Sequence, residues 1–315
     1  MGFYLLSYLC FAVFVVAAGC RIYRQLSLPV HVRWEIYPVQ HEPAAKAAYG
    51  GSYMEELNWW EKRRERSLLT ELGYMVPEIL LIRGLWKENR NLWWVSFPFH
   101  FGLYLMIGVF GLLLLGAGLT LWGSAIYTEG SGLRTLLDGL ILVMGWGGLI
   151  LGTVGSLGLL YRRLANPEFR NYATPADYFN LLFILLFFLS ALVAGLSNNP
   201  SLEGAKAYML GLLSGGHSPA PYLPGRSIPG AVAIVSASLL GAYIPLTHMS
   251  HMFMKYFLYH EVKWDDTPNR PGGRIEAAVR KNLDLKPTWG ARHVGADGRK
   301  TWGDIASSSP EEEKK

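Results

Sequence analysis

Cysteine is scarce in this chain, and its scarcity excludes several kinds of chemistry. The only two cysteines, Cys10 and Cys20, lie in the first apolar stretch and form neither a CxxC pair nor the ligand set of an iron–sulfur cluster. Any iron–sulfur chemistry must therefore belong to a partner. The sequence also lacks an internal repeat, a GxGxxG or Walker loop and a nucleophile elbow, so the usual motifs of nucleotide-binding enzymes and hydrolases are missing.

Charge is absent from long stretches. No charged residue lies between Arg90 and Glu129, and none lies between Arg226 and Lys255. Hydrophobic residues make up 51% of the chain and the mean hydropathy is +0.19, which is too apolar for an ordinary soluble domain. About 18 helical residues are enough to cross a hydrocarbon core of about 30 Å. The sequence therefore predicts an all-α membrane protein with five transmembrane helices, at about residues 3–20, 95–122, 135–161, 178–197 and 228–256.

Basic residues are concentrated in alternate connections. The segment between the first and second apolar stretches holds 11 Lys and Arg, the one between the third and fourth holds 3, and the segment from Lys255 onwards holds 12. The other two connections hold 1 and 2, and nothing basic precedes the first stretch. Cytoplasmic loops carry the excess of Lys and Arg, so we expect the N-terminus outside and the C-terminus in the cytoplasm. The formal net charge of +5 then reflects topology and not a nucleic-acid partner.

The N-terminal stretch is expected to remain as a helix. Its apolar core ends in "AAGC", which faintly resembles a lipoprotein cleavage site. A signal peptide carries its positive charge before the apolar run, whereas Arg21 and Arg24 follow it here. We therefore expect an uncleaved first transmembrane helix.

The predicted organisation has four parts. In the segment before the second apolar stretch, a helical pattern interrupted at Pro77 alternates Trp and Leu with Arg and Lys, as in helices that lie along a membrane interface. The external connection contains "SGGHSPAPYLPGRSIPG", a Pro/Gly loop with little helix potential. Aromatic and charged residues of the insert and tail suit a docking surface for a cytoplasmic partner. The parts are a transmembrane helix (1–20), a cytoplasmic insert (21–94), a bundle of four transmembrane helices (95–257) and a cytoplasmic tail (258–315).

Three of the eight histidines, His100, His248 and His251, lie within predicted spans. His100 is near the start of the second helix and the others are near the end of the fifth. All three are thus within about 8–14 Å of the inner membrane edge, at 1.5 Å per residue. Two imidazoles on neighbouring antiparallel helices at one depth can hold haem iron from both sides, which suits a one-electron carrier.

Small residues near these histidines allow a flat macrocycle or another helix to approach the backbone closely. The spacing favours a b-type haem, while structural histidines, and a metal or proton site, stay open as alternatives. The glycines concerned are Gly102, Gly108, Gly111, Gly230 and Gly241.

Several longer motifs carry a family resemblance. "FHFGLYLMIGVFGLLLL" and "YIPLTHMSH", with five spans, resemble the gamma subunit of respiratory nitrate reductase. "RWEIYPVQHEP", "YGGSYMEELNWWEKRRE", "NLWWVSFPFHFGLYL" and "YFLYHEVKWDDTPN" resemble more closely the membrane b-type cytochromes of sulfate-reducer transmembrane redox complexes, including the sulfite-reductase-associated one. The resemblance covers most of the chain. It implies a subunit that passes electrons between membrane quinone and a cytoplasmic iron–sulfur subunit.

The resemblance also implies which residues bind haem. The nitrate reductase pattern uses four histidines, two on the second span and two on the fifth, to hold two stacked haems. Its inner-side pair aligns with His100 and with His251, which is placed by Pro245 six residues earlier. Its outer-side pair falls on Phe110 and Ala233, neither of which can ligate iron. The resemblance therefore implies a single haem b.

The two remaining histidines of this segment have other expected roles. His248 lies about 60° round the predicted helix from His251, and it stays an alternative axial ligand or a neighbour of haem or quinone. We favour His251 as the ligand. His260 is about half a turn out of phase with His251 and is expected on the docking surface for a cytoplasmic partner.

The sequence and the resemblance together predict an electron-transfer subunit of a quinone-linked oxidoreductase complex in the prokaryotic cytoplasmic membrane, with no catalytic residue assigned. The expected partners are menaquinone, membrane lipid and a heterodisulfide-reductase-like iron–sulfur subunit, and a periplasmic multihaem cytochrome is left open. One rival is a small permease with a histidine proton relay, although paired halves and broken helices, the usual marks of transporters, are missing. Another rival is a haem-free membrane anchor.

Overall fold

The structure is a computed structural model of the chain, and its described residues are predominantly helical, with one pair of short strands. Much of the predicted insert lies outside the described residues, as do His41, His217, His260 and His293. The described residues are 2–33, 42–45, 57–58, 61–63, 67–198, 200–216, 227–251, 254, 261–263, 268–289 and 297–308.

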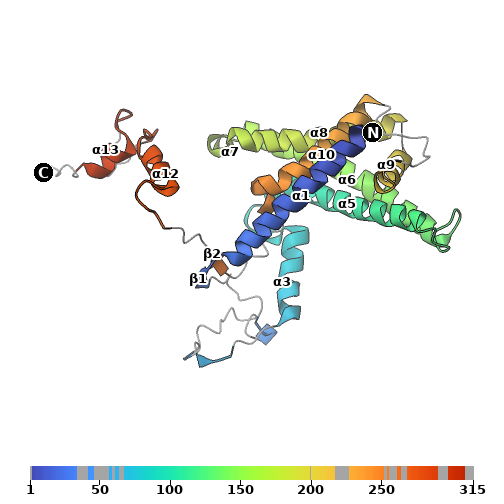
Figure 1. The fold of residues 1–315 in the computed structure, drawn as a ribbon, viewed down its shortest axis with the longest axis horizontal. Coiled ribbons are helices and arrows are strands. Elements are labelled where there is room, and N and C mark those ends of the chain that lie inside the picture. The colour runs from blue at the N-terminus through green and yellow to red at the C-terminus, as the bar shows by residue number, and fades with distance from the viewer. Residues whose placement is uncertain are drawn as a thin grey trace. The chain divides into compact units, whose positions relative to one another are not determined.

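Five helices in this part of the chain are long and apolar enough to cross a membrane, which confirms the predicted number. Side chains at three of their starts accept a hydrogen bond from the first turn, as helix caps do: Asn89, Ser131 and Ser227. The five helices are α1 (Gly2–Ser27), α5 (Arg90–Leu121), α6 (Gly132–Ala165), α8 (Pro175–Asn198) and α10 (Ile228–Tyr243), the last counted together with the turn that follows it to Leu246 (Figure 1).

The fifth helix ends earlier than the sequence predicts. α10 stops at Tyr243 and two short 3₁₀ turns follow, η4 (Ile244–Leu246) and η5 (His248–Ser250). Pro245 explains the break, because proline has no N–H to donate and its ring clashes with the carbonyl four residues earlier. His248 and His251 therefore lie on a 3₁₀ turn and just after it. The 60° offset expected from α-helical periodicity does not apply to them.

The helical pattern of the insert breaks at Ile82 and not at Pro77. α3 (Leu68–Leu81) contains Pro77, and the chain turns at Ile82, whose φ of 51° is left-handed, before α4 (Arg83–Glu88) begins. The Glu78 carboxylate accepts a hydrogen bond from the Gly84 N–H at 2.8 Å. This bond stabilises the turn, so the turn and not the proline ends the helix.

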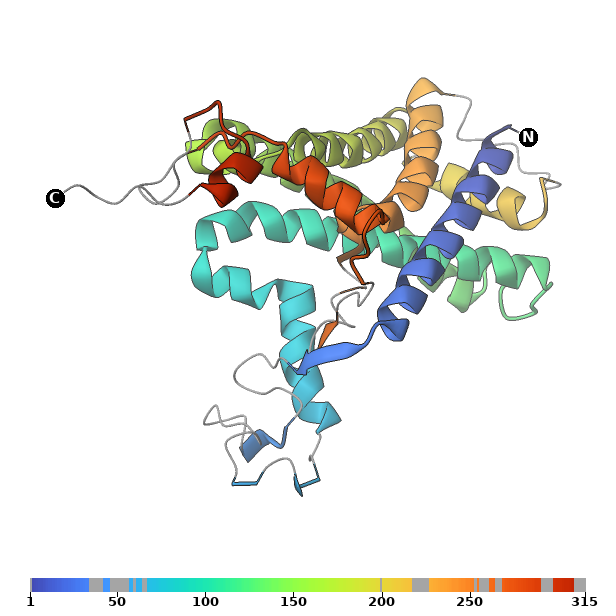
Figure 2. The same cartoon turned by 60° about the vertical axis from the view of Figure 1, so that its left-hand side comes forward.

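The end of α3 is attached to α5. Trp93 Nε1 donates to the Leu81 carbonyl at 2.7 Å, and the Tyr104 hydroxyl donates to the Ile79 carbonyl at 2.8 Å. Figure 2 shows α4 folded back along the start of α5, and α3 standing roughly at a right angle to both on one side. None of the α3 side chains is buried, so the apolar side chains of this helix are exposed to the surroundings of the bundle.

The remaining elements are short. One of them, α9, lies in the connection between α8 and α10, just before the Pro/Gly segment that the sequence predicted as a loop. These elements are α7 (Pro167–Tyr172), α9 (Glu203–Leu213), α12 (Arg274–Leu283), α13 (Trp302–Ser307) and the paired strands β1 (Val30–Arg33) and β2 (Glu261–Lys263).

Glycines bring α5 and α6 into backbone contact. A Cβ built on Gly102 would lie 2.5 Å from Gly152 N, and one built on Gly155 would overlap the backbone of Phe99. Phe188 of α8, which is fully buried, fills the space beside Gly152. Gly102 therefore admits another helix and not a macrocycle.

Gly230 is buried at the start of α10, and the other three glycines expected to admit a macrocycle divide into two kinds. Gly108 faces the Met144 side chain of α6, so it too admits a helix. Gly111 and Gly241 have no atom within 4 Å of a Cβ built on them. The space beside these two glycines is open, so their surroundings favour neither a helix nor a macrocycle.

The bundle has two halves with different fillings. The half where α5 begins, called here the histidine half, holds a buried cluster on which Met249 packs. The other half, called the α9 half, holds a second cluster to which α9 and the residue before it contribute. The first cluster is Phe99, Leu149, Leu181, Ile184, Phe188 and Leu240, and the second is Val109, Leu113, Ala117, Ile141, Leu202 and Met209.

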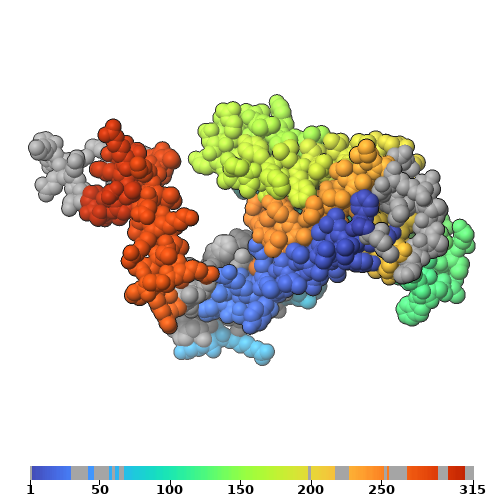
Figure 3. Space-filling model, turned by 45° about the horizontal axis from the view of Figure 1, so that its top comes forward, coloured from blue at the N-terminus to red at the C-terminus, as the bar shows by residue number. Residues whose placement is uncertain are grey.

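α1 lies beside α10 on the surface of the bundle (Figure 3). The Ser7 hydroxyl shares hydrogen bonds with the Ser238 hydroxyl of α10 at 2.7 Å and with the Tyr208 hydroxyl of α9 at 2.8 Å. Most of the other side chains of α1 are exposed; Leu9 and Val16, for example, are 58% and 64% exposed. Such an apolar surface suits contact with lipid.

The chain divides into two compact units, residues 1–27 with 32–262, and residues 28–31 with 263–315. The second unit contains α12 and α13. Thr301 and Asp304 form a reciprocal capping box at the start of α13, and the Trp289 and Trp302 rings lie 5.7 Å apart. These local contacts order the described part of the tail.

Candidate functional site

His100 projects from α5 with one ring nitrogen held by the backbone. Its Nδ1 lies 2.8 Å from the Ser96 carbonyl oxygen and 3.3 Å from the Ser96 hydroxyl. A carbonyl oxygen only accepts hydrogen bonds, so Nδ1 carries the proton. The ring of Phe99 packs edge-on against the imidazole at 5.1 Å. In the neutral ring, Nε2 is then unprotonated and has a lone pair to offer.

His251 is held in the same way. It follows η5, and its Nδ1 lies 3.0 Å from the His248 carbonyl oxygen. Nδ1 is again the protonated nitrogen, and Nε2 again has a free lone pair. Histidines that bind metals usually donate the other N–H to a carbonyl or carboxylate, which fixes the ring. His100 and His251 both have this arrangement.

His248 is engaged differently. The Tyr243 hydroxyl donates to Asn180 Oδ1 at 2.8 Å, so the amide nitrogen of Asn180 is the atom that faces His248 Nε2, at 3.4 Å. Asn180 is only 6% exposed. The lone pair of His248 Nε2 is therefore used by an amide donor, and the contact ties α8 to the turn after α10.

The structure brings the three histidines to one half of the bundle. The rings of His100 and His251 are close enough to interact electrostatically. Met249 lies between His248 and His251 in the sequence. It packs on the buried cluster that contains Phe99, the residue before His100. Both α5 and α10 are fully described, yet they do not pack closely on each other, since α5 packs on α6 and α9 and α10 packs on α8 and α1. The space between their histidines is thus not closed by a helix–helix contact.

The ligand set fits some groups better than others. Within the described ranges, no group of three or more His, Cys, Asp or Glu side chains lies close enough to hold a metal ion. A bare zinc ion usually takes three or four protein ligands, whereas haem iron needs only the two axial ones. The pair His100 and His251 therefore matches the number of protein ligands that a haem iron takes and falls short of the number that a bare zinc ion takes.

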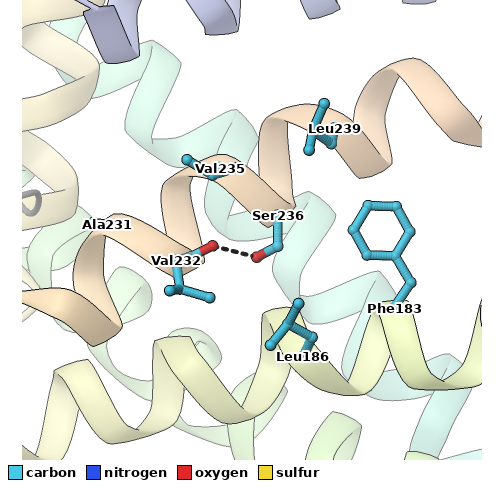
Figure 4. Close-up of a pocket in the computed structure, with 7 residues that line it drawn as sticks. All are labelled: Phe183, Leu186, Ala231, Val232, Val235, Ser236 and Leu239. Atoms are coloured by element: carbon cyan, nitrogen blue, oxygen red, sulfur yellow. Dashed lines mark hydrogen bonds between the residues drawn. The ribbon is translucent and has the colours of Figure 1, made fainter.

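A shallow groove of about 240 Å³ lies between α8 and α10 (Figure 4). The Ser236 hydroxyl is the only polar side-chain group on it, and it donates to the Val232 carbonyl at 2.7 Å. The groove has no group that could ligate iron or exchange a proton. Its lining residues are Phe183, Leu186, Ala231, Val232, Val235, Ser236 and Leu239.

Residues that the sequence reasoning did not single out complete the candidate site. Asn180 and Tyr243 hold His248, and Ser96 orients His100. A signal for Asn180 was present, since it is the most polar residue in an otherwise apolar stretch, "YFNLLFILLFFLSALV". Its partner could not be read from the sequence because the contact depends on the turns η4 and η5.

Comparisons of the chain with protein-family models, curated proteins and solved structures give no match. The function is therefore argued from the site and from the resemblance in the motifs.

Proposed function

We propose that this chain is a membrane-anchored b-type cytochrome subunit in which His100 and His251 ligate one haem. The observation that carries the proposal is the matched pair of rings, each with Nδ1 bonded to a backbone carbonyl and with no hydrogen bond from Nε2 to a described residue. When bound, haem b supplies a one-electron ferric/ferrous couple. The two histidines would hold the iron from both sides and leave no site on it for oxygen, which would favour electron transfer over oxygen chemistry.

The choice of His251 over His248 rests on hydrogen bonding. His248 Nε2 is engaged by the Asn180 amide, and Asn180 is itself held by Tyr243. Ligation by His248 would leave the buried Asn180 amide without its partner, which costs about 1–3 kcal/mol. His251 can ligate without breaking any hydrogen bond of its ring.

The proposed stoichiometry of one haem is supported by the other half of the bundle. Phe110 and Ala233 replace the second pair of ligands, and Leu202 and Met209 from the α9 segment are buried there among α5 and α6 side chains. Neither phenylalanine nor alanine can ligate iron, so a second haem would have no ligands at these two positions.

The electron partners and the orientation follow from charge and resemblance. Five crossings put the chain ends on opposite sides of the membrane, and the basic residues favour a cytoplasmic C-terminus, testable with a reporter fused after Lys315. The proposed role is electron transfer between menaquinone and a cytoplasmic, heterodisulfide-reductase-like iron–sulfur subunit of an anaerobic respiratory complex. A periplasmic multihaem cytochrome is a further partner that this role leaves open.

The hydrogen bonds also bear on the rival functions. A histidine proton relay takes up a proton at one ring nitrogen and releases it from the other. His100 and His251 direct their Nδ1 protons to carbonyls of the helix and turn backbone, and these carbonyls cannot pass a proton on. This arrangement disfavours a permease. A haem-free anchor would have no need for two rings of the same tautomer facing one region.

An alkaline pyridine haemochrome assay on the purified chain tests the proposal. We expect one haem b per chain with a low-spin spectrum, which His100→Ala or His251→Ala abolishes or converts to high spin. His248→Ala is the matched control, since it removes an imidazole from the same turn and should keep the low-spin signal. Absence of haem, two haems per chain, or loss of the low-spin signal only in His248→Ala would each contradict the proposal.

A further inference from the structure

An arginine of α1 reaches into the turn that carries the histidines. Arg21 Nη1 donates to the Ser250 hydroxyl at 2.9 Å. Ser250 is only 2% exposed, so the guanidinium turns inwards to a buried acceptor. An arginine near the end of a transmembrane helix would otherwise extend its side chain towards the lipid headgroups. The inward direction indicates that the charge has a use inside the bundle.

The acceptor is firmly placed beside His251. Ser250 is the residue immediately before it, and the Ser250 hydroxyl donates to the Thr247 carbonyl at 2.9 Å. α1 also packs on η4, the turn before η5. The guanidinium is thus held against the same short segment that orients the His251 ring, and its remaining N–H donors are not used by that single bond.

Arg21 has no carboxylate partner in the part of the chain that the structure describes. The ion pairs seen there join other residues, Arg134, Arg163, Lys206 and Arg280, to their acidic neighbours. Arg21 is half-buried, and a partly buried charge is stabilised when an anion lies beside it. The site is therefore suited to an anionic oxygen group supplied from outside the described chain.

We infer that Arg21, positioned by Ser250, binds a carboxylate of the macrocycle held between His100 and His251. This inference rests on the proposed function. Haem b carries two propionate side chains, and a guanidinium offers a carboxylate two parallel N–H donors. A lipid phosphate has the same oxygen chemistry and could approach from the membrane, so the test must separate the two sources. Arg21 is a positioning residue: it touches the edge of the group and not the iron.

The consequence is a shift in redox potential. A cation near the iron stabilises the ferrous state, which carries one positive charge fewer, and neutralising a propionate removes a negative charge that stabilises the ferric state. Arg21→Gln should therefore lower the midpoint potential of the haem. It should also make that potential more dependent on pH, because a propionate without its guanidinium takes up a proton more readily on reduction.

The experiment is a spectroelectrochemical titration of the purified full chain in nanodiscs, made at several pH values. Arg21→Lys keeps the charge and should stay close to the wild-type potential. Ser250→Ala removes the anchor of Arg21, together with the bond of that hydroxyl to the Thr247 carbonyl, and should give a smaller downward shift than Arg21→Gln. Arg134→Gln, which removes an arginine at the far end of the bundle, is the matched control and should change nothing.

The outcomes are distinguishable. An unchanged potential in Arg21→Gln with intact low-spin haem overturns the inference, and so does a loss of bound anionic phospholipid in that variant without a redox shift, since a lipid phosphate is then the ligand. If Arg21→Gln loses the haem entirely, the Ser250→Ala shift decides, and its absence overturns the inference. A wild-type chain without low-spin haem would instead contradict the proposed function itself.

Discussion

The histidine half and the α9 half of the bundle share α5 and α6 but are filled differently. In the histidine half, polar groups from α5, α8, α10 and α1 meet between the spans and bond to one another or to the backbone. In the α9 half, the space between α5 and α6 is filled by apolar side chains, with Leu202 against Gly145. Polar groups inside a membrane are costly, so the gathering of imidazoles, an amide and a guanidinium in the histidine half favours a function there.

The different fillings predict different effects of substitutions in the two halves. Changes in the histidine half should alter haem binding or potential, whereas changes in the α9 half should alter stability alone. Leu202 illustrates the second kind, because it is buried at a φ of 59°, a left-handed conformation that an ordinary residue adopts only when its surroundings impose it. The buried side chain compensates for the backbone strain.

The largest effect is expected from Gly155→Val. The new side chain would overlap the backbone of Phe99 and force α5 away from α6 next to His100. We expect a destabilisation of at least about 3 kcal/mol, at the upper end for overpacked sites, and a fall in haem per chain. Both are measured on the detergent-purified protein by haemochrome assay and thermal denaturation. Gly139→Val is the control on the same helix, since no atom lies within 4 Å of its Cβ position. Equal behaviour of the two variants would show that the glycine contact is not tight.

An intermediate effect is expected from Leu202→Ala in the α9 half. Removing a buried leucine leaves a cavity and costs about 2–4 kcal/mol, so the apparent melting temperature should fall. The low-spin spectrum and the midpoint potential should stay at their wild-type values. Leu213→Ala, at a 44% exposed position of α9, serves as the control and should change little. A redox shift in Leu202→Ala would mean that the two halves are coupled.

The smallest effect is expected from Lys206→Met. The Lys206 ammonium lies 2.8 Å from Asp138 Oδ1 and 2.9 Å from Glu203 Oε1. The ion pair with Asp138 links α9 to α6. Burial acts to lower the pKa of Lys206, but its hydrogen bonds to the two carboxylates outweigh burial and raise the pKa above its usual value. Because these groups are partly exposed, we expect a loss below about 1 kcal/mol.

The pH dependence of that small effect has a definite sign. A raised folded-state pKa means that the stabilisation is complete below the unfolded value of about 10.4 and is lost as pH rises through the higher folded value. The difference in melting temperature between wild type and Lys206→Met should therefore be constant from pH 7 to 9 and shrink towards pH 11. A difference that grows with pH would contradict the assigned ion pairs.

Long-range contacts mark the limit of what the sequence could predict. Uncharged runs predict the five helices well, because crossing a membrane requires length and apolarity in one continuous segment. The end of the fifth helix is set by Pro245, and reading that proline as a helix terminator would have placed His248 and His251 on turns. α9 escaped prediction because the neighbouring Pro/Gly segment dominated the pattern. The contacts Arg21–Ser250 and Asn180–His248 join residues more than 60 positions apart, and no local pattern predicts them.

The attachment of α3 to α5 has a mechanical consequence. Trp93 and Tyr104 lie before and after His100 in α5, and each donates a hydrogen bond to α3. Both acceptors are backbone carbonyls, those of Leu81 and Ile79. These two hydrogen bonds do not depend on the side chains of Leu81 and Ile79, so substitutions at those positions should preserve them. A pull on the insert, from a bound protein or from the bilayer, would be felt by the turn of α5 that carries His100 before it reached the other spans.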